Sequence, residues 1–434
     1  GPACGGSYSG AAMNNNKKIL SGSVVLGNGL LTSMMFASAS QAAGFIDDAH
    51  GTFQASNFYY SRDFRDGAGQ SKREEWAQGF MLDLRSGYTQ GTVGFGLDAL
   101  GMLGVRLDSS PDRTGSGLLP VHDDGRAAGE YSKLGLTGKM KVSRSELKVG
   151  TLQFKMPLLV GNTGRILPQT FQGGVIDSKE LDHFTFTAGS INRAVARDST
   201  DNDALTLTNR NRRFVATPQA DHFRFGGVDY AFSPTLNLTY QAAELEDIYR
   251  QHYLGLVHTL PLGPGKLKTD LRYFISDKSG AANAGDIDNR SFNGILTYSL
   301  QGHAFGVSYQ SLTGRTAMPY VGGADVYTSH FALVGDFVER NERTWQLRYD
   351  FDFATVGLPG LTVMTRYIAG NDADVLTHNG NGSEWERNSE IGYSVQSGVL
   401  KNVGVRWRNS TYRSNFTRGV DENRLIISYS LPLF

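Results

Sequence analysis

At Trp345-Gln346-Leu347-Arg348-Tyr349-Asp350-Phe351-Asp352-Phe353, every odd position carries a large apolar side chain and every even position a polar or charged one. A repeat of two residues indicates a β-strand with one apolar face and one polar face. Soluble β-sandwiches and membrane barrels both contain such strands. The segment therefore predicts a strand but leaves the class of protein open.

The same alternation returns in two later segments, and in both the polar face carries arginine. In 361–368 Arg366 lies on the face opposite the apolar positions, and in 403–408 Arg406 and Arg408 do so. Each of these strands has one apolar face and one face that carries basic residues. This pattern favours a membrane barrel, with lipid outside and a basic, water-filled lumen inside. The lipid-facing side chains predicted by this phase are Trp345, Leu347, Tyr349, Phe351, Val405 and Trp407.

Composition supports this class. The chain has 42 basic and 42 acidic residues and no strongly basic block, so nucleic acid is a poor candidate partner. After the first 42 residues no run of eighteen apolar residues occurs, which excludes a helical membrane protein but leaves a β-barrel possible. Its 53 Gly and its Tyr and Phe residues suit tight turns and aromatic girdles.

The first 42 residues have the pattern of a secretory signal preceded by an extension. Residues 1–12 are expected to be upstream sequence or a cloning remnant. Residues 13–42 contain two lysines, an apolar stretch and small residues up to Ala42, where we expect cleavage. The alternative, a membrane anchor at 19–37, fits less well because the stretch contains several Gly and Ser. The barrel domain is then 43–434. It lacks cysteine, since Cys4 is the only one in the chain.

Beyond the signal, short connectors alternate with long polar ones, as in bacterial barrels. Leu158–Asp182 is too rich in Gly and Pro for a strand ladder, and Arg193–Arg213 is a candidate extracellular loop. Phe434 is out of phase with the preceding strand, so a bulge is expected at Pro432. The predicted strands are Gly51–Phe64, Glu75–Gly87, Thr92–Asp108, Tyr131–Ser143, Glu146–Gly150, His183–Gly189, Phe223–Phe232, Leu236–Ala243, Tyr249–Leu260, Lys268–Ser276, Phe292–Leu300, Phe305–Gln310, His330–Val338, 344–353, 361–369, 388–396, 402–412 and 424–433.

Several motifs resemble those of one family. Arg165-Ile-Leu-Pro-Gln-Thr-Phe-Gln-Gly-Gly174 resembles the constriction-loop motif of the OprD-type (Occ) substrate-specific outer-membrane porins of Gram-negative bacteria. Further resemblances, in family order, are Glu244-Leu-Glu-Asp-Ile-Tyr-Arg-Gln251, Ala284-Gly-Asp-Ile-Asp288, Trp345-Gln-Leu-Arg-Tyr-Asp350, Arg366-Tyr-Ile-Ala-Gly370, Val395-Gln-Ser-Gly398 and Arg424-Leu-Ile-Ile-Ser428.

The resemblance implies an all-β fold: a transmembrane antiparallel barrel of about eighteen strands with an inward-folded constriction loop. It also implies an outer-membrane channel for small carboxylate-bearing solutes. The expected partners are those solutes, outer-membrane lipid and lipopolysaccharide, and the barrel assembly machinery. No cofactor or metal is expected. Asp198-Ser-Thr-Asp201 resembles the branch that prefers cyclic and aromatic carboxylates.

The resemblance also implies a ladder of basic side chains along the lumen. Six arginines match family ladder positions: Arg165, Arg348, Arg366, Arg406, Arg408 and Arg424. Phase alone adds Arg272, Lys139 and Lys141 as inward-pointing, and Asp350 as a counter-charge that could contact a substrate amine. A guanidinium matches a carboxylate with two parallel hydrogen bonds, and a row of weak sites lets an anion step through.

Three alternatives remain open. Each arginine could instead hold the wall together through a salt bridge, and Arg165 could only pin the constriction loop. The chain could be an outer-membrane barrel enzyme, a hydrolase or protease, although no spacing of Ser, His and Asp indicates a triad. It could also be an adhesion barrel with a plugged lumen, which would not need a basic ladder.

Overall fold

The computed structural model describes residues 44–434; the expected extension 1–12 and the expected signal peptide 13–42 lie outside them. Within the described residues, one antiparallel sheet contains nineteen strands, of which β10 (Asp203–Ala204) is a two-residue pairing, so eighteen strands form the wall. They are β1 (His50–Phe64), β2 (Lys72–Arg85), β3 (Val93–Asp108), β4 (Glu130–Val142), β5 (Ser145–Leu152), β8 (Thr170–Ser178), β9 (Phe184–Val195), β11 (Phe223–Ser233), β12 (Leu236–Leu245), β13 (Tyr249–Leu262), β14 (Gly265–Lys278), β15 (Asp288–Leu300), β16 (His303–Gly314), β17 (Arg343–Asp352), β18 (Leu361–Ala373), β19 (Gly382–Ser394), β20 (Gly404–Ser414) and β21 (Val420–Pro432).

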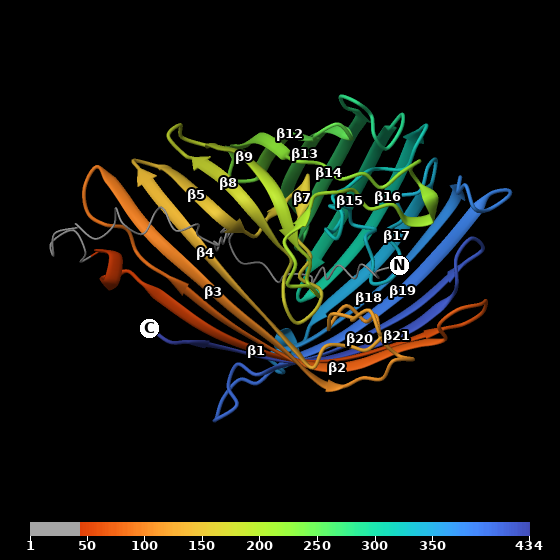
Figure 1. The fold of residues 1–434 in the computed structure, drawn as a ribbon, viewed down its shortest axis with the longest axis horizontal. Helices are drawn as coiled ribbons and strands as arrows, with labels where there is room; N and C mark the ends of the chain where they lie inside the picture. Colours follow the sequence, from red (N-terminus) through yellow and green to blue (C-terminus); the bar gives the residue numbers. More distant parts are fainter. Residues whose placement is uncertain (1–43) are drawn as a thin grey trace.

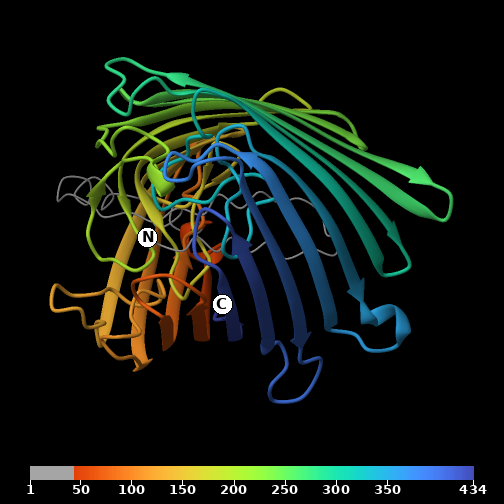
Figure 2. The same ribbon diagram turned by 90° about the vertical axis from the view of Figure 1, so that its right-hand side faces the viewer.

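The wall closes on itself because β1 pairs with both β2 and β21. Figures 1 and 2 show the long tilted strands running around the ring, with the first and last strands adjacent. Closure leaves no sheet edge, and an unpaired edge could not be tolerated in lipid. This confirms the predicted fold class. Among the described residues, no helix is long and apolar enough to span a membrane.

The two faces of the wall have the predicted phase. In β17, Trp345 and Leu347 are exposed on the outer surface while Gln346 is buried. In β20, Val405 and Trp407 are exposed and Arg408 is buried. A shift of one residue would exchange these faces and place the arginines in lipid, at about 2–4 kcal/mol each near the midplane.

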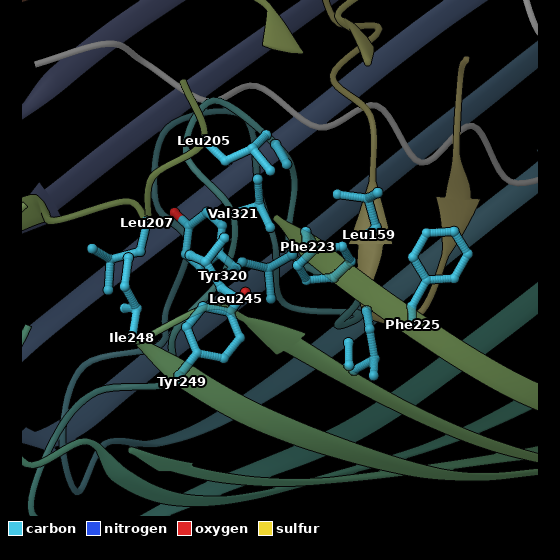
Figure 3. Packing of buried hydrophobic residues seen from close by; sticks show 14 of the residues in the cluster. Leu159, Leu205, Leu207, Phe223, Phe225, Leu245, Ile248, Tyr249, Tyr320 and Val321 are labelled. Atoms are coloured by element: carbon cyan, nitrogen blue, oxygen red, sulfur yellow. The ribbon is translucent and has the colours of Figure 1, made fainter. Parts of the chain in front are cut away.

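The main hydrophobic core lies inside the barrel rather than in the wall itself. Three long connections fold inward: the constriction loop (residues 153–169), the 196–222 loop and the 315–342 loop. Their apolar side chains pack against the inner faces of wall strands β8, β9, β11–β14 and β16. Figure 3 shows part of this cluster, in which Leu159, Leu205, Leu207 and Val321 from the loops meet Phe223, Leu245 and Tyr249 from the wall.

Backbone contacts join the three loops into one unit. Val160 of the constriction loop, which carries the small hairpin β6 (Lys155–Met156) and β7 (Leu159–Val160), bridges to Asp325. Leu207 bridges to Val321, and the Thr208 N–H donates to the Tyr320 carbonyl at 3.0 Å. The 315–342 loop is therefore the centre of the assembly, with the other two loops attached on either side.

Buried polar anchors fix the 315–342 loop to the wall and to the 196–222 loop. His330 is fully buried, with Nε2 at 2.7 Å from the Ser308 hydroxyl and Nδ1 against the Thr344 hydroxyl. Arg213, which follows the short 3₁₀ helix η1 (Arg210–Arg212), forms a bidentate pair with Asp336 at 2.6 Å. The second 3₁₀ helix, η2 (Phe353–Val356), lies in the connection from β17 to β18.

Four sequence-based expectations need correction. His330–Val338 is not a strand, because its apolar side chains pack inside the barrel instead of facing lipid. Leu158–Asp182 is not irregular throughout, since its second half forms wall strand β8. The loop after β9 folds inward through Leu205 and Leu207 rather than standing as a plain outer loop. The expected bulge at Pro432 is absent, because the register between β1 and β21 continues unshifted to that residue.

Candidate functional site: a basic ladder on the lumen wall

Five of the six arginines assigned to the ladder lie on neighbouring strands, with their side chains on the inner face. Arg348 of β17 is the register partner of Arg366 of β18, and Arg408 of β20 is the register partner of Arg424 of β21. Arg406 lies two residues before Arg408 on the same face. The row thus follows the hydrogen-bonding direction of the sheet, where adjacent strands lie about 4.8 Å apart.

The row continues into β1 through a residue that the sequence analysis missed. Arg62 is 4 % exposed, and its Nε donates to Glu422 at 2.7 Å. Its inward phase was readable from the alternation of Tyr60 and Arg62 in β1. None of the family motifs quoted above lies in β1, so nothing distinguished Arg62 from other inward-facing residues.

Carboxylates are interleaved with the guanidiniums. Glu390 of β19 stands between Arg406, at 3.2 Å, and Arg408, at 3.5 Å. Glu422 stands between Arg62, at 2.7 Å, and Arg424, at 2.9 Å. Such pairing compensates for the cost of burying charge, and it holds each planar fork in one orientation.

Asp350, predicted as a counter-charge, has this same role toward Arg348. The arginine Nε lies 2.8 Å from the Asp350 carboxylate, and Nη2 lies 3.0 Å from its other oxygen. The two residues are two apart on one strand, so both project to the same face of β17.

The ladder arginines differ in how accessible they are. The side chain of Arg406 is 34 % exposed and that of Arg348 is 17 % exposed, whereas Arg408 is at 3 % and Arg424 at 0 %. Arg366 is also buried, and its Nη2 donates to the Phe331 carbonyl at 3.4 Å. Among the ladder arginines of the wall, Arg406 and Arg348 are therefore the most accessible to water in the lumen.

Two of the buried arginines hold the 315–342 loop. Arg366 reaches the Phe331 carbonyl, and Arg424 Nη2 donates to the Leu333 carbonyl at 3.1 Å. Arg366 and Arg424 therefore have a structural role, as the alternative reading of the ladder arginines proposed, because they fix the loop that narrows the lumen.

Arg165, the loop-borne member, joins the ladder at the constriction. Its Nε donates to the Ser116 carbonyl at 2.6 Å and its Nη1 to the Gly164 carbonyl at 2.8 Å. Its guanidinium carbon lies 4.7 Å from the centre of the Tyr60 ring, and that of Arg424 lies 5.6 Å from the same ring. Burial and the nearby Arg197 and Arg424 lower the pKa of Arg165 well below its usual value.

This cluster contains buried donors that protein groups do not satisfy. Arg165 Nη2 and Arg424 Nη1 are both buried without a hydrogen-bond partner among the described residues. An unmet buried donor is costly, and because protein groups enclose both atoms, a solute in the lumen does not reach them in this arrangement. Asp325 of the 315–342 loop faces the same region. Burial raises its pKa to about 7, against the opposing effect of Arg197, Arg165 and Arg424.

The remaining predicted residues lie elsewhere on the wall. Arg272 of β14 pairs with Asp270 at 2.8 Å and stacks on Tyr327, with the guanidinium carbon 3.9 Å from the ring centre. It is 8 % exposed and stands apart from the ladder. Its inward direction is as predicted.

Lys139 and Lys141 lie on β4, close to the short turn that leads to β5. Lys139 is paired with Asp98 at 2.8 Å and donates to the Ser86 carbonyl at 2.7 Å. Lys141 is exposed above the ring of Tyr88. They form a second basic patch at the end of the barrel away from the constriction. Within residues 44–434, no cluster of His, Cys, Asp or Glu is suited to hold a metal ion.

Comparison with known proteins agrees with this architecture. Residues 43–433 match the family model described as outer membrane porin, OprD family. The porin-like protein GalP of Pseudomonas putida is 41 % identical over 396 residues, which cover 90 % of this chain and 94 % of GalP. These relatives are porins, that is, channels, and nothing among them supports the barrel-enzyme alternative.

Two solved structures from Pseudomonas aeruginosa extend the likeness to the fold. OccK5 (OpdH) is 52 % identical with a TM-score of 0.82, and OpdK, solved with vanillate, is 39 % identical with a TM-score of 0.85. In both cases the match covers 90 % of this chain and the whole of the other. This chain therefore belongs to the OprD family of outer membrane porins.

Proposed function

We propose that this porin admits small carboxylate-bearing solutes, with aromatic and cyclic carboxylates foremost, by selective passive diffusion across the outer membrane. The observation that carries the proposal is the row of inward guanidiniums on β17, β18, β20, β21 and β1, which is interrupted only at β19, where Asn388 and Glu390 take the place of an arginine.

Along the row, guanidinium N–H groups replace part of the hydration shell that an anion loses when it enters the narrow lumen. An accessible guanidinium such as Arg406 or Arg348 presents N–H groups that match the two oxygens of a carboxylate. At the constriction, Arg165 and Arg424 are buried, and they add positive charge beside the path without contacting the solute directly. A solute can therefore move from one guanidinium group to the next without being held at a single strong binding site.

The interleaved acids tune this path. Glu390 competes with a solute for Arg406 and Arg408, so each site holds an anion only weakly. Asp350 is bound to Arg348 and accessible enough to meet the amine of an amino-acid solute. Weak sites in series favour passage over retention.

A relative supports the choice of solute. OpdK was solved with vanillate, an aromatic carboxylate, and it matches this chain along its whole length. We extend that chemistry to this chain because its own ladder presents planar donors. We further propose that residues 13–42 act as the signal peptide, and that barrel assembly machinery inserts residues 43–434.

Liposome swelling tests the proposal. Wild-type protein and the Arg348→Gln plus Arg406→Gln variant are compared with benzoate and with a neutral sugar. We expect benzoate entry to fall several-fold and sugar entry to stay within about twofold, because a lost charge-assisted hydrogen bond is worth about 1.5–3 kcal/mol at most when desolvated. Arg250→Gln, at an outward rim position paired with Glu244, is the matched control. Equal losses for both solutes would show that the arginines only hold the wall.

A further inference from the structure

Several outward-facing arginines on the rim of the barrel are paired with acids of the wall. Arg250 lies 2.9 Å from Glu244, Arg413 lies 3.0 Å from Asp421 and Arg224 lies 3.7 Å from Glu246. Hydrogen bonds join the charges in the first two pairs, and in the third the two charges lie within ion-pair distance. These arginines have no need of an external anion.

Arg343 of β17 and Arg387 of β19, which lie close to one another on the outer wall, have no such partner among residues 44–434. Both are exposed and both have the phase of the outer face, since Arg343 alternates with the buried Thr344 and Arg387 with the buried Glu386. Within residues 44–434, no carboxylate lies within ion-pair distance of either one. The guanidinium of Arg387 has a single hydrogen bond there, from Nη2 to the Thr411 hydroxyl at 3.3 Å.

An aromatic stack lies between these two arginines. Trp345 and Tyr367 have ring centres 5.4 Å apart, and Tyr367 and Trp385 have ring centres 5.6 Å apart with the rings stacked. Tyr367 is the register partner of Arg387, and Trp385 precedes Arg387 by two residues on the same face. Trp and Tyr of this kind mark the depth where the hydrocarbon meets the headgroups.

The position of the unpaired charges follows from this. The long connections, and therefore the extracellular side, lie at the end of β17 where Arg343 begins the strand. Arg343 lies on the loop side of an aromatic platform at the level of the outer-leaflet headgroups, and Arg387 lies two residues beyond Trp385, from where its long side chain can extend to that level. An arginine facing lipid is costly near the midplane, but at headgroup depth it can extend toward phosphate and bind it with two parallel hydrogen bonds.

We propose that the outer wall over β17–β19, with Arg343, Arg387, Trp345, Tyr367 and Trp385, binds the phosphorylated headgroup of a lipopolysaccharide molecule. The arginines contact phosphate, the aromatic stack lies against the sugar and the upper acyl chains, and Thr411 keeps the Arg387 fork oriented. This site lies outside the lumen, so it is independent of the transport path.

Native mass spectrometry of the purified full-length barrel in mild detergent tests the site. Added lipopolysaccharide is compared with the same lipid after removal of its phosphates and with inorganic phosphate alone. We expect the wild type to retain the phosphorylated lipid, and Arg343→Gln plus Arg387→Gln to weaken retention by about tenfold or more, as for one lost charge-assisted hydrogen bond. The dephosphorylated lipid should bind wild type and variant equally weakly, and inorganic phosphate alone should not be retained.

Controls separate this result from misfolding and from self-association. Arg224→Gln removes an exposed outward arginine that has an acid partner, and it should behave as the wild type. Arg343→Lys plus Arg387→Lys keeps the charge and should recover part of the retention. Folding is checked by the heat-dependent gel shift of the barrel. Undiminished lipid retention in the folded Gln variant, equal retention of the dephosphorylated lipid, or a change only in oligomeric state would overturn the proposal.

Discussion

The pair between Arg213 and Asp336 is expected to act as the clamp that keeps two inward loops docked. Arg213 Nη1 and Nη2 each lie 2.6 Å from an oxygen of Asp336, and Nη2 also lies 2.7 Å from Glu339. All three side chains are 2–3 % exposed. Burial alone would raise the pKa of Asp336, but Arg213 and Arg210 hold it well below its usual value.

Replacing Arg213 by Met leaves two carboxylates buried without their main partner. Loss of one member of a buried pair costs about 3–5 kcal/mol. The lower end applies here because Arg210 remains at 3.4 Å from Asp336 and the Tyr320 hydroxyl still donates to it at 2.7 Å. A cost of about 3 kcal/mol shifts the docking equilibrium of the 196–222 and 315–342 loops by roughly a hundredfold.

Hydrogen exchange and single-channel recording measure this shift. Amides of the two loops should exchange faster by up to that factor, while amides of β1–β5 stay protected because the wall ladder is unchanged. Conductance should rise or fluctuate between levels. Arg212→Gln, one residue earlier and exposed, is the matched control. If the Arg213→Met barrel exchanges and conducts like the wild type, the clamp argument is wrong.

Three further predictions concern the loops and the ladder. Deleting part of residues 153–169 should raise conductance and flatten selectivity; unchanged bilayer conductance would mean that this loop does not set the pore. Burial, with Arg366 nearby, lowers the pKa of His330 to about 3 from 6.5, so its contribution to stability is complete above pH 6.5 and is lost as the pH falls toward 3. Exchange of the 315–342 loop should therefore accelerate over that range, and His330→Asn should remove this slope; a slope that persists in the variant would exclude His330 as its source. Glu390→Gln should free Arg406 and shift the reversal potential in a salt gradient toward anions, and a shift toward cations would contradict the pairing.

The wall of the barrel was predictable because the alternation of side chains is a local property. In β17 and β20, successive side chains point to opposite faces of the wall, so the face of one residue predicts the face of the next. The exposed side chains of Trp345 and Trp407 confirm the predicted outer face. The predicted number of strands was eighteen, yet it included His330–Val338 and omitted β8. The two errors compensated. A short apolar segment does not reveal whether its partner is lipid or the inside of a loop.

The candidate site was only partly predictable for the same reason. Phase placed Arg408 and Arg424 on the inner face, but it could not tell that Arg424 is buried beneath Leu333 whereas Arg406 remains open. That difference depends on the 315–342 loop, which contacts β21 across about ninety residues of sequence. Arg62 was missed because its partner Glu422 is brought to it only when the barrel closes.

The central claim is that carboxylates travel along the guanidinium row. The most direct measurement is a crystal structure of the purified barrel with a bromine-labelled benzoate, located by anomalous scattering. We predict bromine peaks along the wall beside the accessible arginines, with carboxylate oxygens within hydrogen-bond distance of Arg406 or of Arg348. Benzoate bound in the lumen only at positions away from these arginines would contradict the account.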